Sequence, residues 1–185
     1  MAGDKDIVSN PELNCNGSSP SAGCNTMAKG EQSNGYTAYN KKTGAAGRYQ
    51  FIPKTAKWIL TSMLGVSASQ ADELWNKCKT SDTPECKSLQ DQMCNKYYEY
   101  TIKQIQRVGV LPLDARSVWF AWNQGVNGAS HIYKKAHEPN PEDRVVTNKT
   151  ILRNMKGQAF NGDNERADIF IQKMHAYLDS GGYPR

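Results

Sequence analysis

Residues 29–51 read KGEQSNGYTAYNKKTGAAGRYQF. A single acidic side chain, Glu31, is followed by glycine, amides, hydroxyls, aromatic rings and basic side chains, and the next acidic residue is Asp72. A solvated surface usually mixes both signs of charge, and a flexible linker does not carry three tyrosines and a phenylalanine. We therefore expect this segment to form a site, with Glu31 at the end of a short helix that begins near Ser21 or Asn25.

Helical patterns follow this segment along the chain. Pro53 stands at a helix-start position, and residues 53–64 place apolar side chains at helical spacing. Residues 69–77 predict a second helix with Ser69 as its cap. The longest pattern spans residues 85–108 and predicts a helix with an apolar stripe that faces the core. This stripe comprises Leu89, Met93, Tyr97, Tyr100 and Ile105.

The second half of the chain also carries helical patterns. Asp114 is expected to cap a helix over residues 115–125, which is apolar almost all round and should therefore be buried. This helix ends in the polar pair Asn123 and Gln124, which is unusual for a buried helix. Further helices are expected over residues 129–137, 149–156 and 164–179.

The expected fold class is mainly α. Only residues 36–49 carry a strand pattern, and they predict at most a small β-hairpin. At 185 residues the chain is long enough for one good core and too short for two ordinary domains by default. Residues 1–22, rich in Asn, Ser, Gly and Pro, are expected to form an irregular arm, and residues 23–185 a single domain.

Composition and charge narrow the partners only slightly. The apolar fraction of 38% and the mean hydropathy of −0.72 fit a globular protein, and no apolar run approaches the roughly 18 residues of a membrane helix. A net charge of +5 and an isoelectric point near 8.9 favour anionic partners such as nucleic acid, membrane surfaces or cell-wall polymers. The basic residues are scattered, so charge alone selects none of these.

The five cysteines indicate disulfides rather than a metal site. They show no paired CxxC spacing, and no histidine lies near them at ligand spacing. We expect an exported protein with two disulfides and a spare thiol, and five reduced cytosolic cysteines remain the alternative. The pairs Cys15–Cys24 and Cys78–Cys86 are favoured because each closes a short polar loop. The opening MAGDKDIVSN shows no signal peptide, so this chain starts at a mature boundary or does not take that export route.

Three segments resemble the motifs of a known family. They are Glu31 followed by QSNGY, GAAGRYQFIPKTA at residues 44–56, and AWNQG at residues 121–125. Together they resemble the catalytic domain of lytic transglycosylases, which has the goose-type-lysozyme-like fold. That family shows Glu-Ser-x-x-x-Tyr, then Gly-Leu-Met-Gln-φ-x-Pro-x-Thr-Ala, then Ala-x-Asn-x-Gly. The order and spacing match over about residues 25–128.

The chain departs from the family pattern at three places. Gln32 stands where the family often has Ser, while Tyr36 falls on the family's Tyr. Arg48 and Tyr49 replace Leu-Met, which gives GRYQF, a form associated with lysins of secretion systems, conjugation machinery and phages. Near the C-terminus, Phe170 or Ile169 stands where the family often carries a supporting Tyr.

The resemblance implies that Glu31 does the chemistry. It would protonate the oxygen of the bond between MurNAc and GlcNAc and then take a proton from the MurNAc C6 hydroxyl, which closes on C1 as a 1,6-anhydro ring. An acid of this kind must hold its proton near neutral pH, which a carboxyl achieves by losing solvation. We therefore predict a raised pKa for Glu31, with surroundings supplied by Tyr49, Phe51 and the helix from Trp119 to Trp122.

The absence of acidic residues from Gln32 to Ala71 favours a one-carboxylate mechanism. Most glycosidases use a second carboxylate, and goose-type lysozymes of this fold place theirs in this segment. The remaining acids are expected to serve as caps or first-turn charges rather than as a hidden second acid. These are Asp72, Glu73, Asp114 and Glu138.

Amides and aromatic rings in the three motifs suit an amino sugar. Gln50 and Asn123 can donate and accept hydrogen bonds to N-acetyl and hydroxyl groups, and glycines let the backbone approach the sugar closely. Aromatic residues offer faces that pack on sugar rings. The expected substrate-binding residues are Gln50, Asn123, Tyr49, Tyr36, Gly47, Ser33 and Trp122.

The expected protein is thus a periplasmic or secreted lytic transglycosylase that acts on peptidoglycan glycan strands and serves a secretion or conjugation apparatus. We expect a monomer without metal, cofactor, nucleic-acid partner or membrane span. A hydrolytic muramidase on the same fold, such as a phage lysin, remains an alternative. A wall-binding or assembly module without turnover is the other, although Glu31, Gln50 and Asn123 argue against it.

Overall fold

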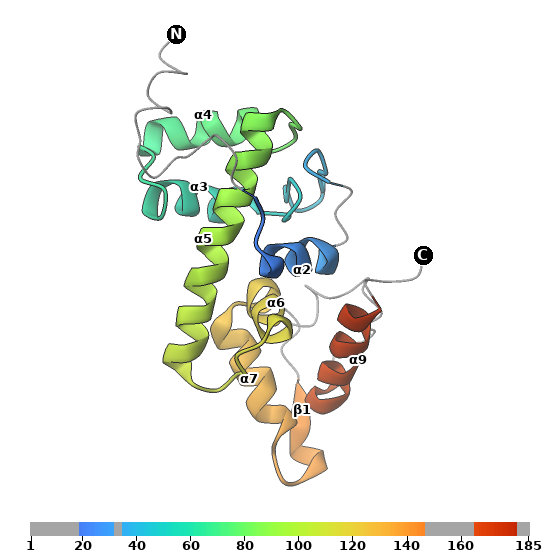
Figure 1. Ribbon diagram of the computed structural model, residues 1–185. Helices are drawn as coiled ribbons and strands as arrows, with labels where there is room; N and C mark the ends of the chain where they lie inside the picture. Colours follow the sequence, from blue (N-terminus) through green and yellow to red (C-terminus); the bar gives the residue numbers. More distant parts are fainter. Residues whose placement is uncertain (1–18, 32–34, 147–164, 181–185) are drawn as a thin grey trace. The chain divides into compact units, whose positions relative to one another are not determined.

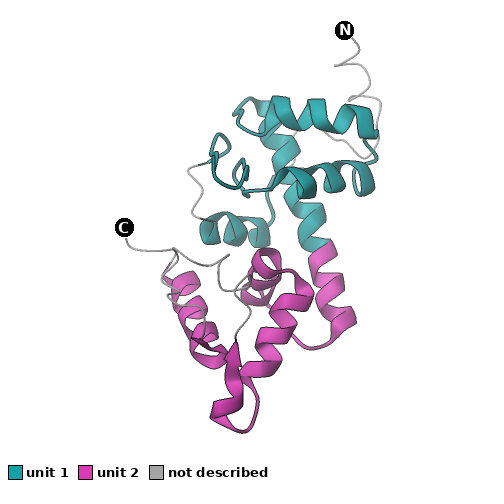
Figure 2. Cartoon of the chain, turned by 180° about the vertical axis from the view of Figure 1, so that it is seen from behind, with its two compact units in different colours: residues 1–99 teal, residues 100–185 magenta. Residues whose placement is uncertain are grey.

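Helices dominate the structure, a computed structural model that describes residues 19–31, 35–146 and 165–180 (Figure 1). The fold class is therefore mainly α, as expected. The chain divides into two compact units, residues 1–99 and residues 100–185 (Figure 2). The division falls within one long helix rather than in a linker. The single domain expected over residues 23–185 stays a prediction.

The first unit begins with helix α2, Ala22–Gly30, whose start and end follow the sequence pattern. The Ser21 side chain accepts a hydrogen bond from the Cys24 backbone N–H, which caps the first turn, and Glu31 is the C-cap. The residues just before α2 are tied down as well. The Asn95 side chain accepts from the Ser21 N–H and donates to the Ser19 carbonyl.

Helices α3, Pro53–Ser62, and α4, Ala68–Cys78, pack against each other. Pro53 occupies the first turn of α3, as its sequence position predicts. The cap expected for α4 is wrong by two residues, because the side chain of Ser67, rather than that of Ser69, accepts from the Gln70 N–H.

Helix α5, Pro84–Val108, is the long helix that the sequence predicts. Leu89, Met93 and Ile105 of its apolar stripe are buried, whereas Tyr97 is half-buried and Tyr100 is exposed. The turns around Leu89 are buried on all sides, because four polar neighbours are buried too. These are Ser88, Gln90, Asp91 and Gln92.

Two disulfides tie α5 to the other helices of the first unit. Cys78–Cys86 joins the end of α4 to the start of α5, as predicted. The pairing of Cys15 with Cys24 is wrong, because Cys24 is bonded to Cys94, 70 residues away. Helix packing brings α2 against α5, and both half-cystines of this bond are fully buried. Disulfides form and persist in oxidising compartments, so the two bonds favour an exported chain.

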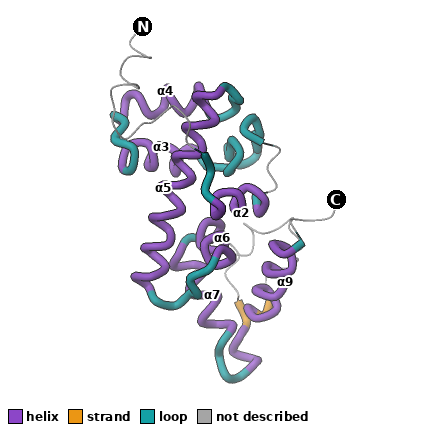
Figure 3. The backbone as a smooth tube through the Cα atoms, in the orientation of Figure 1, coloured by secondary structure: helices purple, strands orange, loops and turns teal. Residues whose placement is uncertain are grey.

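The segment between α2 and α3 is folded mostly by turns (Figure 3). The hairpin expected over residues 36–49 is reduced to isolated bridges, from Tyr39 to Ala46 and from Ala46 to Phe51. Phe51 brings the segment into the core, where its ring packs edge-on against Trp75 and Tyr97. The turns thus stand on the same core that α4 and α5 share.

The second unit contains α6, Ala115–Gln124, and α7, Val126–Ala136, which pack together. Asp114 caps α6 through the Ser117 N–H, and the middle of α6 is buried, both as predicted. Gly125, with φ of 72°, separates the two helices. Helix α9, Ala167–Asp179, packs against α7, and its aromatic rings contact those of α6.

A short 3₁₀ helix η1, Pro141–Arg144, leads into strand β1, Val145–Val146, which pairs antiparallel with β2, Glu165–Arg166. This two-stranded sheet was not among the expected elements. The helix expected over residues 149–156 lies outside the described residues. Among the described helices, none combines the length and apolar character needed to cross a membrane.

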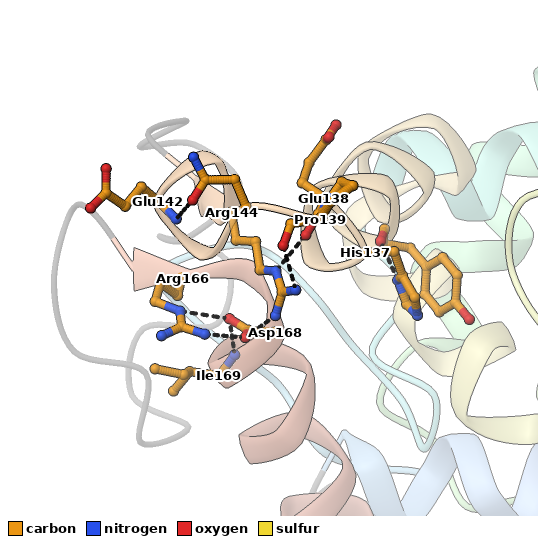
Figure 4. Close-up of polar contacts among 10 residues, drawn as sticks. His137, Glu138, Pro139, Glu142, Arg144, Arg166, Asp168 and Ile169 are labelled. Atoms are coloured by element: carbon orange, nitrogen blue, oxygen red, sulfur yellow. Dashed lines mark hydrogen bonds and ion pairs between the residues drawn. The ribbon is translucent and has the colours of Figure 1, made fainter.

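An ion-pair cluster fixes the start of α9 (Figure 4). Arg144 donates to Asp168 Oδ2 at 3.1 Å and to the Glu138 carbonyl at 2.7 Å, while Arg166 bonds the same carboxylate with two nitrogens. Hydrogen bonds from Arg166 hold the pKa of Asp168 at about 2, well below its ordinary value. The carboxylate thus joins the 138–144 segment to α9.

Candidate functional site

Glu31 lies at the C-terminal end of α2, where its backbone N–H donates to the Met27 carbonyl at 3.0 Å. The residue is partly exposed, but its carboxyl is surrounded by protein. This loss of solvation raises the pKa of Glu31 from 4.5 to about 7. The raised pKa predicted from the sequence is therefore confirmed, and the carboxyl holds a proton for much of the time near neutral pH.

A buried carboxylate organises the residues that follow Glu31. Asp91 of α5 is 4% exposed and accepts hydrogen bonds from two phenols. The Tyr36 hydroxyl lies 3.0 Å from both carboxylate oxygens, and the Tyr49 hydroxyl lies 2.7 Å from Oδ1. Burial raises the pKa of Asp91, while the two phenols and the Arg48 charge oppose that rise. Burial likewise raises the pKa of both tyrosines, so they stay neutral and able to donate.

Arg48 connects this network to α2. Its Nη1 donates to the Tyr36 hydroxyl at 2.9 Å, and its Nη2 donates to Asn25 Oδ1 on α2 at 3.0 Å. The guanidinium carbon lies 5.3 Å from the centre of the Tyr36 ring, and the Lys87 amine lies 5.7 Å from the same centre. Two cations therefore flank Tyr36, within the distance at which a cation and an aromatic face attract.

Gln90 holds the turn that carries Arg48. Its Oε1 accepts from the Arg48 backbone N–H at 2.9 Å, and its Nε2 donates to the carbonyls of Tyr36 and Cys78. A Cβ on Gly47 would lie 2.4 Å from Gln90 Oε1, and Gly47 has φ of 77°. Gly47 is buried, so the close approach that it permits in this structure is that of Gln90 rather than of a sugar.

Gln50 has the strained backbone of the site. Its φ of 50° is the only positive value at a non-glycine residue in the described part of the chain. Its Nε2 donates to the Gly47 carbonyl at 2.9 Å. Left-handed backbone at a non-glycine residue costs about 1–2 kcal/mol and persists where the surroundings impose it, commonly at functional sites. Gln50 is partly exposed, so a ligand can reach it.

The other residues expected in the site lie in different environments. Tyr49 is fully buried, so its ring supports the network from the core and offers no face to a sugar. Asn123 and Trp122 belong to the second unit, where both are partly exposed and Asn123 Oδ1 accepts from Gln124 Nε2 at 2.5 Å. Ser33 lies outside the described residues.

The first unit thus holds Glu31 at the end of α2, and it ties Tyr36, Gln50 and the turn around Gly47 together by hydrogen bonds. The sequence pattern does not single out Asp91 or Gln90, which hold this segment to α5. One signal for them exists: Cys86 and Cys94 bracket these residues about two helical turns apart, and a disulfide at each indicates that the helix is covered there. Among the described residues, no cluster of His, Cys, Asp and Glu is arranged to hold a metal ion.

Comparisons with family models, curated proteins and solved structures find no match for this chain. One carboxyl retains a proton near neutral pH, and α2, at whose end it lies, is tied by the Arg48 guanidinium to the network of Tyr36, Tyr49 and Asp91. Such a carboxyl can give a proton to a leaving group and take one back.

Proposed function

We propose that the chain is a peptidoglycan lytic transglycosylase in which Glu31 acts as general acid and then as base. The observation that carries this proposal is the placement of Glu31 at the C-terminal end of α2 with its carboxyl shielded from solvent, which raises its pKa to about 7. A carboxyl with that pKa is both a good acid and a good base at neutral pH, because the two forms are similarly populated. The resemblance of the three motifs to lytic transglycosylases supplies the substrate class.

The reaction would run in two proton transfers. The Glu31 carboxyl first gives its proton to the oxygen between MurNAc C1 and GlcNAc C4, the C1–O bond breaks, and positive charge develops at C1. The resulting carboxylate then takes the proton of the MurNAc C6 hydroxyl, and that oxygen forms a new bond to C1. Glu31 regains its proton, no water is consumed, and the product ends in 1,6-anhydro-MurNAc.

Among the described residues of the first unit, Gln50 is the one best suited to bind the sugar. Its strained backbone is retained in a partly exposed position, which is typical of residues that function requires in one pose. With Nε2 engaged by the Gly47 carbonyl, the amide oxygen is the group that can accept from a sugar hydroxyl or N-acetyl N–H. The roles expected for Tyr36, Asn123, Trp122 and Ser33 remain predictions.

The proposed setting is the periplasm or the cell exterior. The two disulfides suit an oxidising compartment, and the net charge of +5 would hold the chain near an anionic wall. The GRYQF form at residues 47–51 supports a role in opening the wall for a secretion or conjugation apparatus.

The test is digestion of purified peptidoglycan by the wild-type chain, by Glu31→Gln and by Glu73→Gln, with the fragments analysed by mass spectrometry. Glu73 is an exposed glutamate on α4, so the same chemical change there controls for nonspecific effects. We expect anhydro-muramyl ends from the wild type and Glu73→Gln, and none from Glu31→Gln.

Two other outcomes would replace the proposal. Reducing ends, heavier by one water, would indicate a hydrolytic muramidase. Binding to peptidoglycan without cleavage by any of the three proteins would indicate a wall-binding or assembly module.

A further inference from the structure

Two anchors lie near Glu31 in the sequence: α2, which Glu31 caps, and the turns that begin at Gly35. On one side, Glu31 caps α2, and Cys24 of α2 is bonded to Cys94 of α5. On the other side, Tyr36 donates to Asp91 of α5 through its hydroxyl and accepts from Gln90 through its carbonyl. Because Glu31 ends α2, its position relative to Tyr36 depends on how α2 is held against the turns that carry Tyr36.

One side chain connects these two anchors directly. The Arg48 guanidinium donates to Asn25 Oδ1 on α2 at 3.0 Å and to the Tyr36 hydroxyl at 2.9 Å. These bonds leave from Nη1 and Nη2, whose relative positions are fixed by the planar guanidinium. A lysine has three donors on a single nitrogen, so it cannot reproduce the fixed spacing of the two guanidinium nitrogens that reach Asn25 and Tyr36.

Arg48 is itself held by the rest of the first unit. Its backbone N–H donates to Gln90, and its guanidinium lies over the rings of Tyr36 and Tyr49. The Tyr36 hydroxyl completes the chain of contacts by donating to the buried Asp91. These contacts hold the Arg48 side chain in one position between α2 and the core.

We propose that Arg48 is a positioning residue for Glu31, because it ties α2, the helix that Glu31 caps, to the network of Tyr36 and Asp91. The inference rests on the proposed function for its effect on turnover. Arg48 does not touch the reacting atoms. It determines the position of the Glu31 carboxyl and the exposure of that carboxyl to water. A merely structural role would instead lower the fraction of folded chain and leave the properties of Glu31 in that fraction unchanged.

The central variant is Arg48→Lys, with Arg144→Lys as its matched control. Arg144 likewise bonds several partners, here in the second unit: the Glu138 carbonyl at 2.7 Å, the Asp168 carboxylate at 3.1 Å and the Pro139 carbonyl at 3.5 Å. Both changes keep the charge and remove one planar fork. The first readout is the pKa of the Glu31 carboxyl, measured by an NMR titration of protein labelled with ¹³C at the glutamate carboxyls. The Glu31 signal is assigned as the one that is missing in Glu31→Gln.

We expect the pKa of Glu31 to fall from about 7 toward 4.5 in Arg48→Lys and to stay near 7 in Arg144→Lys. We also expect kcat on glycan strands at pH 7 to fall by about tenfold to a hundredfold with KM changed less than about twofold, since small misplacements of a reacting group cost rate rather than binding. The alkaline limb of the pH profile, where Glu31 loses the proton that the first step needs, should move with the pKa.

A second variant guards against poor folding of Arg48→Lys. Asn25→Ala removes only the bond to α2, at a partly exposed helical position where alanine is well tolerated. It should shift the pKa of Glu31 in the same direction. Combined with Arg48→Lys, it should add little, because both changes break the same connection.

The outcomes separate this inference from the proposed function. If the wild type cleaves peptidoglycan but Arg48→Lys keeps its kcat and the pKa of Glu31, Arg48 does not position Glu31, and the proposed function stands. A raised KM with unchanged kcat would overturn the inference in favour of direct substrate binding. If the wild type does not cleave, the proposed function fails, and the NMR titration still decides whether Arg48 sets the environment of Glu31.

Discussion

The raised pKa of Glu31 suits proton transfer but lowers the stability of the fold at neutral pH. In the folded chain it holds its proton up to about pH 7, whereas an unfolded glutamate releases it near pH 4.5. Between these values the folded state binds more protons than the unfolded state, so the free energy of unfolding decreases as the pH rises. The residue that suits proton transfer therefore destabilises the chain when it is ionised.

Replacing Glu31 with Gln should remove this pH dependence. Below pH 4.5 both proteins are neutral at this position, and their stabilities should differ by a constant. As the pH rises from 4.5 to about 7, Glu31→Gln should gain about 2–3 kcal/mol relative to the wild type. Urea unfolding of both proteins across this range measures the difference, and a difference that does not vary with pH would rule out the desolvated carboxyl.

Gly47 and Gly44 form a matched pair for the packing of the turn. Both have positive φ, so alanine at either costs about 1–2 kcal/mol of backbone strain. A Cβ at Gly44 meets only Pro53 at an ordinary 3.5 Å, whereas at Gly47 it lies 2.4 Å from Gln90 Oε1. Gly47→Ala must also displace a buried, hydrogen-bonded amide, so we expect it to be about 1–3 kcal/mol more costly than Gly44→Ala. Equal losses in chemical denaturation would mean that Gln90 does not lie over the turn.

At the scale of elements, local sequence signals predict the helices, but they do not predict contacts between residues far apart in the chain. Caps and 3.6-residue periodicity lie within a few residues of one another, which is why α2, α3, α5 and α6 could be predicted. The α4 cap moved by two residues because Ser67 and Ser69 offer the same chemistry. The pairing of β1 with β2 depends on tertiary packing that no local pattern encodes.

The same contrast explains what could be predicted of the candidate site. Glu31, Gln50 and the glycine turns stand in one short segment, so their chemistry shows in the sequence. Asp91 and Gln90 act on that segment from 42 or more residues away, through hydrogen bonds that only the packing of α5 creates. Buried polar side chains on a long helix look like an ordinary solvated face until the partners are known.

The two disulfides should contribute unequally to stability. Cys24–Cys94 closes a separation of 70 residues and Cys78–Cys86 one of 8, so loop-closure entropy predicts losses of about 4 and about 3 kcal/mol when each pair is replaced by alanine. Only the first pair anchors α2, so only its loss should also lower activity per folded molecule. Denaturation and turnover of the two double variants test this, and a larger functional loss from the Cys78–Cys86 pair would contradict it.

At the scale of the whole molecule, the three motifs fall in two units. Glu31 and Gln50 belong to the first unit, and Asn123 to the second. The first unit contains the proposed acid, the strained glutamine and the network around Asp91. The chemistry proposed for Glu31 therefore rests on residues of one unit. The contribution of Asn123 remains a prediction of the resemblance.

The central claim is that one carboxyl cleaves the glycan strand without water. The most direct measurement is digestion of peptidoglycan in ¹⁸O-labelled water, with immediate borohydride reduction and mass spectrometry of the new ends. The account predicts anhydro-muramyl ends that carry no ¹⁸O and are absent with Glu31→Gln. Reducing ends that carry ¹⁸O would contradict it, because they would show that water, rather than the C6 hydroxyl, attacks C1.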